Sequence, residues 1–216
     1  MNERSAFSLR GIPMLLTVLV AALLYGLWIA RLATAPGARP LQIFAAAAAA
    51  LLVLGFLCRG FFQVQPNQGK VVQLFGRYAG TVREAGLRWT NPFYARRPIS
   101  LRVRNFESGR LKVNDSDGNP IEIAAVVVWQ VVDTAEAMFC VDDYENFVQI
   151  QTESALRQMA QSYPYDAHDD AQPSLRSHGD AINLHLRDEI QQRLGKAGVK
   201  VVEARISHLA YAQEIA

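Results

Sequence analysis

The stretch Ile12–Ala30, IPMLLTVLVAALLYGLWIA, contains nineteen residues and no charged side chain. A helix of this length spans roughly 28 Å, close to the thickness of the hydrocarbon core of a bilayer. A second uncharged stretch of eighteen residues, Leu41–Cys58, reads LQIFAAAAAALLVLGFLC. As a helix it would be about 27 Å long. The sequence therefore predicts two membrane-spanning helices, at about residues 12–30 and 41–58.

The segment between these stretches, RLATAPGARP, contains two prolines and two arginines. Its backbone polar groups cannot stay unsatisfied in lipid, so the chain must leave the hydrocarbon core there. We therefore expect a helical hairpin with both ends on one side of the membrane, and residues 1–60 as the membrane anchor.

Positive charge near the spans favours one orientation of this hairpin. The outer flanks carry Arg4, Arg10, Arg59 and Lys70, and the connection carries Arg31 and Arg39. Because basic flanks stay cytoplasmic, the domain after the hairpin is expected on the cytoplasmic side. An alternative is a secretory signal cleaved at Ala33-Thr34-Ala35, which would leave one anchor and a periplasmic domain.

Composition limits what the rest of the chain does. The 216 residues are 50% hydrophobic and 19% charged, which suits one domain plus an apolar part. Residues 61–216 hold 17 basic and 19 acidic side chains and are therefore about neutral. Nucleic-acid binders need a basic footprint, so we expect no nucleic-acid partner. Two cysteines cannot form a disulfide scaffold.

The first half of residues 61–212 has the patterns of strands. Gly69–Gly76 is a short β-branched run, and Ile99, Leu101 and Val103 alternate with polar residues as in a half-buried strand. Asp115–Asn119 contains an Asp-Gly pair between two apolar runs, which predicts a hairpin. The second arm of that hairpin, Ile121–Val132, is apolar on both faces and is expected to be a central strand.

Helical periodicity follows. Apolar residues recur every three or four positions from about Asp142 to Pro164, and again from Ile182 to Leu194. The polar segment 166–180 between them is expected to be a loop. The alternating residues Val202–Ser207 predict a last strand, and residues 213–216 are expected to start a truncated helix.

A set of short motifs then indicates a family. In chain order they are Gly69-Lys70-Val71-Val72 with Phe75-Gly76, Gly86-Leu87-Arg88-Trp89 leading to Pro92, Val126–Val131, Ala155-Leu156-Arg157, and Gly198-Val199 leading to Ala204-Arg205-Ile206. Together, after a membrane anchor, these motifs resemble the SPFH or Band 7 family over about residues 61–212. That family includes stomatins, prohibitins, flotillins and the bacterial modulators of membrane AAA proteases.

The resemblance implies an α+β domain lying on a membrane, and the expected fold is therefore the predicted transmembrane hairpin followed by an antiparallel-rich sheet with packed helices. It also implies a bacterial inner-membrane, multi-pass protein that organises membrane proteins or microdomains by lateral self-association. The alternative function is regulation of a membrane-bound protease, and other integral membrane proteins are further expected partners. The sequence departs from the family pattern by ending at Ala216, before the long coiled-coil helix that normally follows such a domain, and this argues against oligomerisation by this chain unless the sequence is a truncated product.

No motif for catalysis, a cofactor or a metal is found in the sequence. Cys58 and Cys140 have no CxxC partner, and the four histidines lack the spacing of a ligand set. Calcium-loop, P-loop, Rossmann and nucleophile-elbow patterns are also missing. We therefore expect no enzyme activity, no cofactor and no metal.

The candidate functional residues lie at the predicted lipid boundary. They are Arg59, Phe61, Phe62, Arg88, Trp89, Arg96 and Arg97, with Phe93 and Tyr94 nearby. Arginine and aromatic side chains favour the headgroup layer. The alternative is that Trp89 is an ordinary core residue beside a proline turn. Cys58 is a candidate for acylation at the membrane edge, and the alternative is a small apolar helix-end residue.

Overall fold

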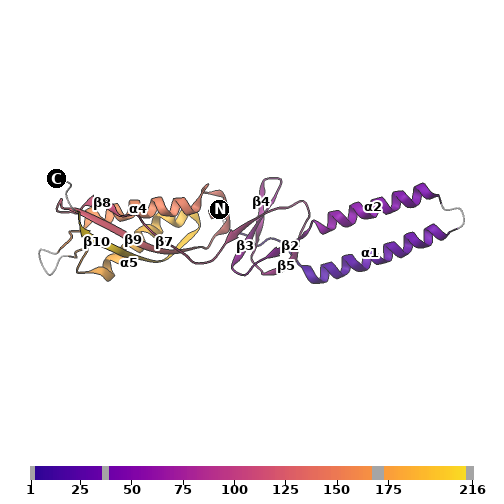
Figure 1. Cartoon of the computed structure of the whole chain (residues 1–216), viewed down its shortest axis with the longest axis horizontal. Coiled ribbons are helices and arrows are strands. Elements are labelled where there is room, and N and C mark those ends of the chain that lie inside the picture. The colour runs from indigo at the N-terminus through magenta and orange to yellow at the C-terminus, as the bar shows by residue number, and fades with distance from the viewer. Residues whose placement is uncertain (1–2, 36–38, 167–172, 213–216) are drawn as a thin grey trace. The chain divides into compact units, whose positions relative to one another are not determined.

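The structure is a computed structural model that describes residues 3–35, 39–166 and 173–212 (Figure 1). The chain forms two compact units. The anchor unit runs from Arg4 to Ile99, and the C-terminal unit comprises Glu3 and the chain from Ser100 onward. The predicted fold class is confirmed, because two long apolar helices precede antiparallel sheets and packed helices.

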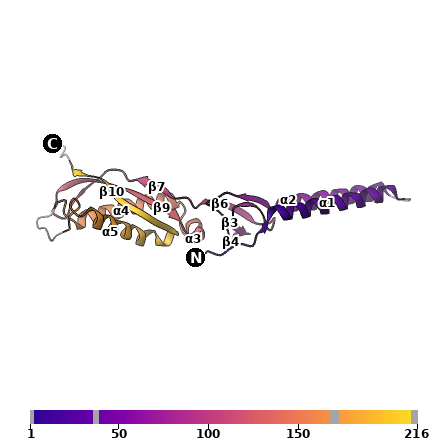
Figure 2. The same cartoon turned by 90° about the horizontal axis from the view of Figure 1, so that it is seen from below.

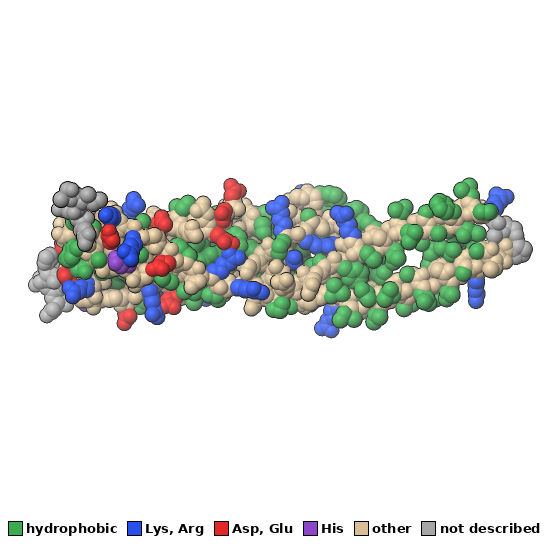
Figure 3. All heavy atoms as spheres, viewed as in Figure 1, with side chains coloured by type: hydrophobic (Ala, Val, Ile, Leu, Met, Phe, Trp, Pro, Cys, Tyr) green, Lys and Arg blue, Asp and Glu red, His purple; other side chains and the backbone are tan. Residues whose placement is uncertain are grey.

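Two helices dominate the anchor unit: α1 spans Gly11–Thr34 and α2 spans Pro40–Cys58. They run side by side in opposite directions (Figures 1 and 2), and the Tyr25 hydroxyl donates a hydrogen bond to the Ala46 carbonyl at 3.3 Å. Both are long and apolar enough to cross a membrane, and only 6% and 0% of their most apolar windows is buried. In Figure 3 hydrophobic side chains cover the visible face of both helices. These helices indicate membrane association.

The rest of the anchor unit consists of two small sheets. One has the order β1-β5-β2, and the other has the order β4-β3-β6. Their strands are β1 Leu9–Arg10, β2 Phe61–Val64, β3 Gln68–Leu74, β4 Arg77–Val82, β5 Gly86–Trp89 and β6 Ala95–Ser100. Val64, Val72 and Val82 are buried together between these strands. This small apolar core holds the β part of the unit.

The residues before α1 belong to this β structure. Thr81 N donates to the Arg4 carbonyl at 2.8 Å, and Ala6 N donates to the Thr81 carbonyl at 3.1 Å. Gly80 has φ of 142° and lies against the backbone of Arg4 and Ala6, so a side chain there would collide with it. The N-terminal segment is therefore tied to β4 before the chain enters α1.

The C-terminal unit is a sheet with helices packed on it (Figure 2). Its strands are β7 Arg104–Glu107, β8 Leu111–Asn114, β9 Pro120–Val131 and β10 Val199–Tyr211. Its helices are α3 Thr134–Phe139, α4 Tyr144–Ser162, α5 Gly179–Leu194 and the short 3-10 helix η1 Gly195–Ala197. As expected, β9 is the central strand, with β10 on one side and β7 and β8 on the other.

The predicted hairpin at Asp115–Asn119 is confirmed. The buried Asp115 carboxylate accepts hydrogen bonds from Asp117 N at 3.0 Å, Asn119 N at 2.8 Å and Tyr165 N at 3.1 Å. Burial acts to raise the pKa of Asp115, but these hydrogen bonds outweigh it and lower the pKa. The ionised carboxylate therefore holds the β8–β9 turn against the segment after α4.

The α5 helix covers the outer edge of β10. The Gln191 side chain donates to the Val199 carbonyl at 3.1 Å and accepts from Val201 N at 2.8 Å. Asn183 accepts from Ile206 N at 3.0 Å in the same way. These side chains satisfy backbone groups that an edge strand would otherwise offer to another chain.

Three details differ from the sequence predictions. The strand expected through Ile99, Leu101 and Val103 is wrong: β6 ends at Ser100, β7 begins at Arg104, and Val103 is 57% exposed. The alternation fails there because the chain passes from one compact unit to the other. The last strand is longer than expected and includes Tyr211. The expected helix at 213–216 and residues 167–172 of the expected loop lie outside the described residues, and α5 begins at Gly179, so that loop ends two residues earlier than expected.

Candidate membrane-boundary site

Strand β5 connects the bases of the two apolar helices. β1 leads directly into α1, and α2 is followed within three residues by β2. β5 lies between these two strands and pairs antiparallel with both. The bases of α1 and α2 are therefore held by one three-stranded sheet, which we call the clasp.

Trp89 is the centre of the clasp. It lies opposite Leu9 on one side and Phe61 on the other. Its indole N–H donates to the Leu57 carbonyl at 2.9 Å, in the last turn of α2. A side chain at Gly60 would collide with the indole ring, so this glycine is needed for the close approach. The Leu57 carbonyl, which also accepts a hydrogen bond from Gly60 N at 3.0 Å, is thus held by donors from beyond the end of the helix.

Arg96 binds the same end of α2. Its guanidinium donates to the Arg59 carbonyl at 3.0 Å and the Phe61 carbonyl at 3.4 Å. It also lies 5.0 Å from the centre of the Phe62 ring. Burial, and secondarily the nearby charge of Arg59, lower the pKa of Arg96. A cation at this position interacts favourably with the negative end of the helix dipole.

Six of the seven predicted boundary residues come together around β2 and β5. Arg59, Phe61, Phe62, Trp89 and Arg96 do so as described, and Arg88 lies opposite Phe62 and forms an ion pair with Glu84. Arg97 is exposed and follows Arg96 in β6, so it points to the opposite face of that strand. Cys58 is the exposed last residue of α2, and its acylation stays a prediction.

The charge of the anchor unit differs sharply from that of the C-terminal unit. Arg4–Ile99 contains eleven lysine and arginine residues and one acidic residue, Glu84, for a formal charge of +10. The remaining residues contain eleven basic and nineteen acidic side chains, for a formal charge of −8. The near-neutral total of residues 61–216 hides this division because the boundary falls inside that range. The apolar helices therefore belong to a strongly basic unit.

Sequence reasoning missed two aromatic residues near the clasp. Phe56, Phe93 and Phe75 form a row with ring-centre distances of 4.9 Å and 6.3 Å. Their exposed fractions are 41%, 59% and 85% in that order. Of these three, only Phe93 was named among the candidate boundary residues and their neighbours in the sequence. The sequence feature that could have identified Phe75 is an aromatic residue placed directly before a glycine, at the end of a predicted strand.

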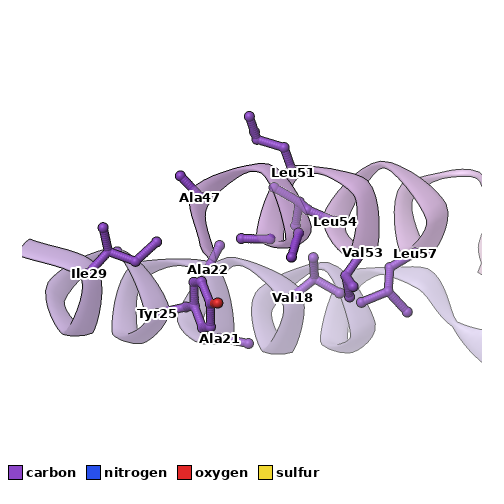
Figure 4. Close-up of a pocket in the computed structure, with 13 residues that line it drawn as sticks. Val18, Ala21, Ala22, Tyr25, Ile29, Ala47, Leu51, Val53, Leu54 and Leu57 are labelled. Atoms are coloured by element: carbon purple, nitrogen blue, oxygen red, sulfur yellow. The ribbon is translucent and has the colours of Figure 1, made fainter. Parts of the chain in front are cut away.

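A groove of about 540 Å³ lies between α1 and α2. Its walls are almost wholly apolar, and Figure 4 shows Val18 of α1 beside Val53, Leu54 and Leu57 of α2. Among the described residues no group of three or more His, Cys, Asp or Glu side chains is placed to hold a metal ion.

Comparison with known proteins agrees with this architecture. The family description "SPFH domain / Band 7 family" matches residues 62–216, which is most of the chain. No curated protein matches the sequence. Proteins of this family are generally membrane-associated scaffolds without catalytic activity, and they typically self-assemble in membranes. The chain belongs to the SPFH domain / Band 7 family.

Proposed function

We propose that this protein is a noncatalytic scaffold, anchored by its α1–α2 hairpin in the bacterial inner membrane, that organises membrane proteins or microdomains by lateral assembly. One observation carries the proposal: two exposed apolar helices belong to a unit of formal charge +10, and β5 pairs with the strands next to both of them. A water-soluble protein does not leave two helices of this kind uncovered.

Anchoring gives this protein a physical means to assemble. A hairpin confines every copy to the plane of the membrane, which raises the effective concentration of copies and partners relative to one another. Weak lateral contacts then add up without a large interface. The same confinement serves contacts with other integral membrane proteins.

The basic charge supports a cytoplasmic position for the β part of the anchor unit. Arg59, Lys70 and Arg77 all follow α2 within twenty residues, and positive flanking charge is retained on the cytoplasmic side. The cytoplasmic leaflet is rich in anionic lipid, where each basic residue near the surface contributes about 1 kcal/mol. The exposed side chains of Arg59 and Arg97 are proposed contacts with these headgroups.

Alkaline extraction of membranes tests the anchoring. The full chain is expected to stay in the pellet, and Leu24→Arg is expected to weaken retention because a charge at the centre of a span costs about 2.5 to 3.5 kcal/mol. Leu184→Arg is the matched control, since Leu24 and Leu184 are 61% and 53% exposed but Leu184 lies in α5. A wild-type chain that leaves the pellet contradicts the proposal.

The native mass of the full chain in mild detergent and in nanodiscs tests the assembly. A scaffold is expected to exceed the monomer mass of 24.0 kDa severalfold. A monomer in both media contradicts lateral self-assembly. Copurification of a membrane-bound protease in fixed ratio would instead favour the alternative, a regulatory partner of such a protease.

A further inference from the structure

The row of exposed phenylalanines begins on a candidate membrane span and ends at a hairpin tip. Phe56 lies in the last turn of α2, Phe93 in the connection between β5 and β6, and Phe75 between β3 and β4. Each ring is within contact range of the next, at 4.9 Å and 6.3 Å between centres. The apolar surface of α2 therefore continues without a break onto the β part of the anchor unit.

Phe75 occupies an unusual backbone conformation. Leu74 and Arg77 face each other in the ladder, so Phe75 and Gly76 form a two-residue turn, with φ of 47° and 82°. Turns with positive φ at both positions favour Asn-Gly, because a bulky side chain is strained there. A phenylalanine that is 85% exposed gains little burial within this chain to offset that strain.

We propose that Phe75 and Phe93 insert into the boundary between headgroups and acyl chains of the membrane, beside the end of α2. The inference rests on the proposed function, since it requires α2 to span the bilayer. The bilayer is the partner that the observations favour, because the row is continuous with the span through Phe56 and belongs to the unit of charge +10. Aromatic rings prefer this boundary layer, and the basic residues around them favour anionic headgroups.

Asn67 provides a matched control within the same unit. It is the only other non-glycine residue with positive φ among the described residues, at 55°. Like Phe75 it is exposed and lies in a turn between strands, here between β2 and β3. β2 starts beside α2 at Phe61 and runs away from it, so Asn67 lies beyond the far end of that strand. A residue there is expected to stay in water.

The test uses the full chain with Cys58 and Cys140 replaced by serine. A polarity-sensitive fluorophore is attached at Phe75→Cys, Asn67→Cys or Leu24→Cys, and each protein is reconstituted into vesicles containing phosphatidylglycerol with or without acyl-chain bromination. Bromines quench a fluorophore only at short range. We expect severalfold stronger quenching at position 75 than at position 67, and strong quenching at position 24.

The three positions separate the two proposals. Strong quenching at 24 with equal, weak quenching at 75 and 67 overturns the insertion of Phe75 and leaves the anchored hairpin intact. No quenching at 24 overturns the anchored hairpin itself. If the fluorophore at position 75 reports an apolar environment but brominated lipid does not quench it, protein and not lipid covers the site. This result also overturns the inference.

A second variant protects the test against damage caused by the label. Phe75→Asn suits the positive φ and is expected to keep the turn. With the fluorophore at Phe93→Cys, the additional Phe75→Asn change is expected to reduce bromolipid quenching severalfold, because the neighbouring anchor in the lipid is lost. Unchanged quenching at position 93 overturns a joint insertion of the two rings.

Discussion

At the scale of single residues, a few side chains hold turns and helix ends in place through hydrogen bonds to the backbone. Asp115 holds the β8–β9 turn through three backbone hydrogen bonds. Trp89 and Arg96 hold the end of α2 through carbonyls of Leu57, Arg59 and Phe61. Each of these side chains joins segments that lie far apart in the sequence.

Removal of the Asp115 carboxylate is expected to destabilise the C-terminal unit. Asp115→Ala leaves the part-buried amides of Asp117, Asn119 and Tyr165 without their acceptor, which costs about 1 to 3 kcal/mol. Denaturant unfolding in detergent, followed by far-ultraviolet circular dichroism, measures the loss. Asp142→Ala, at an exposed position, is the control and is expected to change stability by less than about 0.5 kcal/mol.

The same carboxylate predicts a dependence on acid. Because the fold lowers the pKa of Asp115, its stabilisation is complete above the pKa of about 3.9 that an unfolded chain has. The stabilisation is lost as the pH falls below that value toward the pKa in the folded protein. The difference in stability between wild type and Asp115→Ala should therefore shrink between pH 5 and strongly acidic conditions, about pH 2. A difference that does not change with pH would contradict this role.

The turn at Phe75 predicts a gain of stability from a polar residue. Phe75→Asn replaces a strained bulky side chain with one that tolerates positive φ, and part of the left-handed cost of about 1 to 2 kcal/mol is relieved. Thermal unfolding in detergent, where no bilayer boundary is present, is the measurement. Phe93→Asn, in the same row but without positive φ, should show no such gain.

At the scale of elements, the sequence predicts those parts whose signal is local. Ile182, Leu186, Ile190 and Leu194 repeat along one helical stripe, and all four are buried in α5. The apolar run of β9 and the Asp-Gly turn before it are equally local, and both are confirmed. The local pattern of apolar residues is enough to identify such elements, because it follows from which faces are buried.

Elements that depend on distant partners were missed. β4, RYAGTV, contains Gly80, whose positive φ and missing side chain allow the N-terminal segment to lie against it. No periodicity in the sequence predicts that contact. β1 has only two residues and is defined by pairing with β5, some eighty positions later. The boundary residues were identifiable by type, but the grip of Trp89 and Arg96 on the end of α2 needed the three-dimensional structure.

The contact of α5 with β10 gives a prediction about the sheet edge. Gln191→Ala removes both hydrogen bonds to the β10 backbone and exposes part of the edge. We expect a loss of about 1 to 2 kcal/mol and faster aggregation, since unpaired edges recruit other chains. Gln192→Ala, at the exposed neighbouring position of α5, is the control. Equal aggregation of the two variants in a light-scattering assay would contradict a protective role for Gln191.

At the scale of the whole molecule, the proposed topology makes the C-terminal unit inaccessible from outside the cell. Cys140 is exposed at the end of α3, so it reacts with a maleimide wherever the reagent reaches it. In a Cys58→Ser background, a membrane-impermeant maleimide should label Cys140 only after the cells are lysed. Labelling of intact spheroplasts would instead support the periplasmic alternative, in which the first span is a cleaved signal.

The clasp also has a mechanical consequence. On the α1 side, β5 pairs with β1 over two residues of each strand. On the α2 side, it pairs with β2 over four residues of each strand. A change in bilayer thickness or a neighbouring protein would exert a lateral force that separates α1 from α2. That force acts on the β1–β5 and β5–β2 pairings at the same time. The shorter β1–β5 ladder is expected to open first, so the base of α1 would move relative to β5 while α2 stays paired through β2 and Arg4 and Ala6 stay hydrogen-bonded to Thr81 of β4.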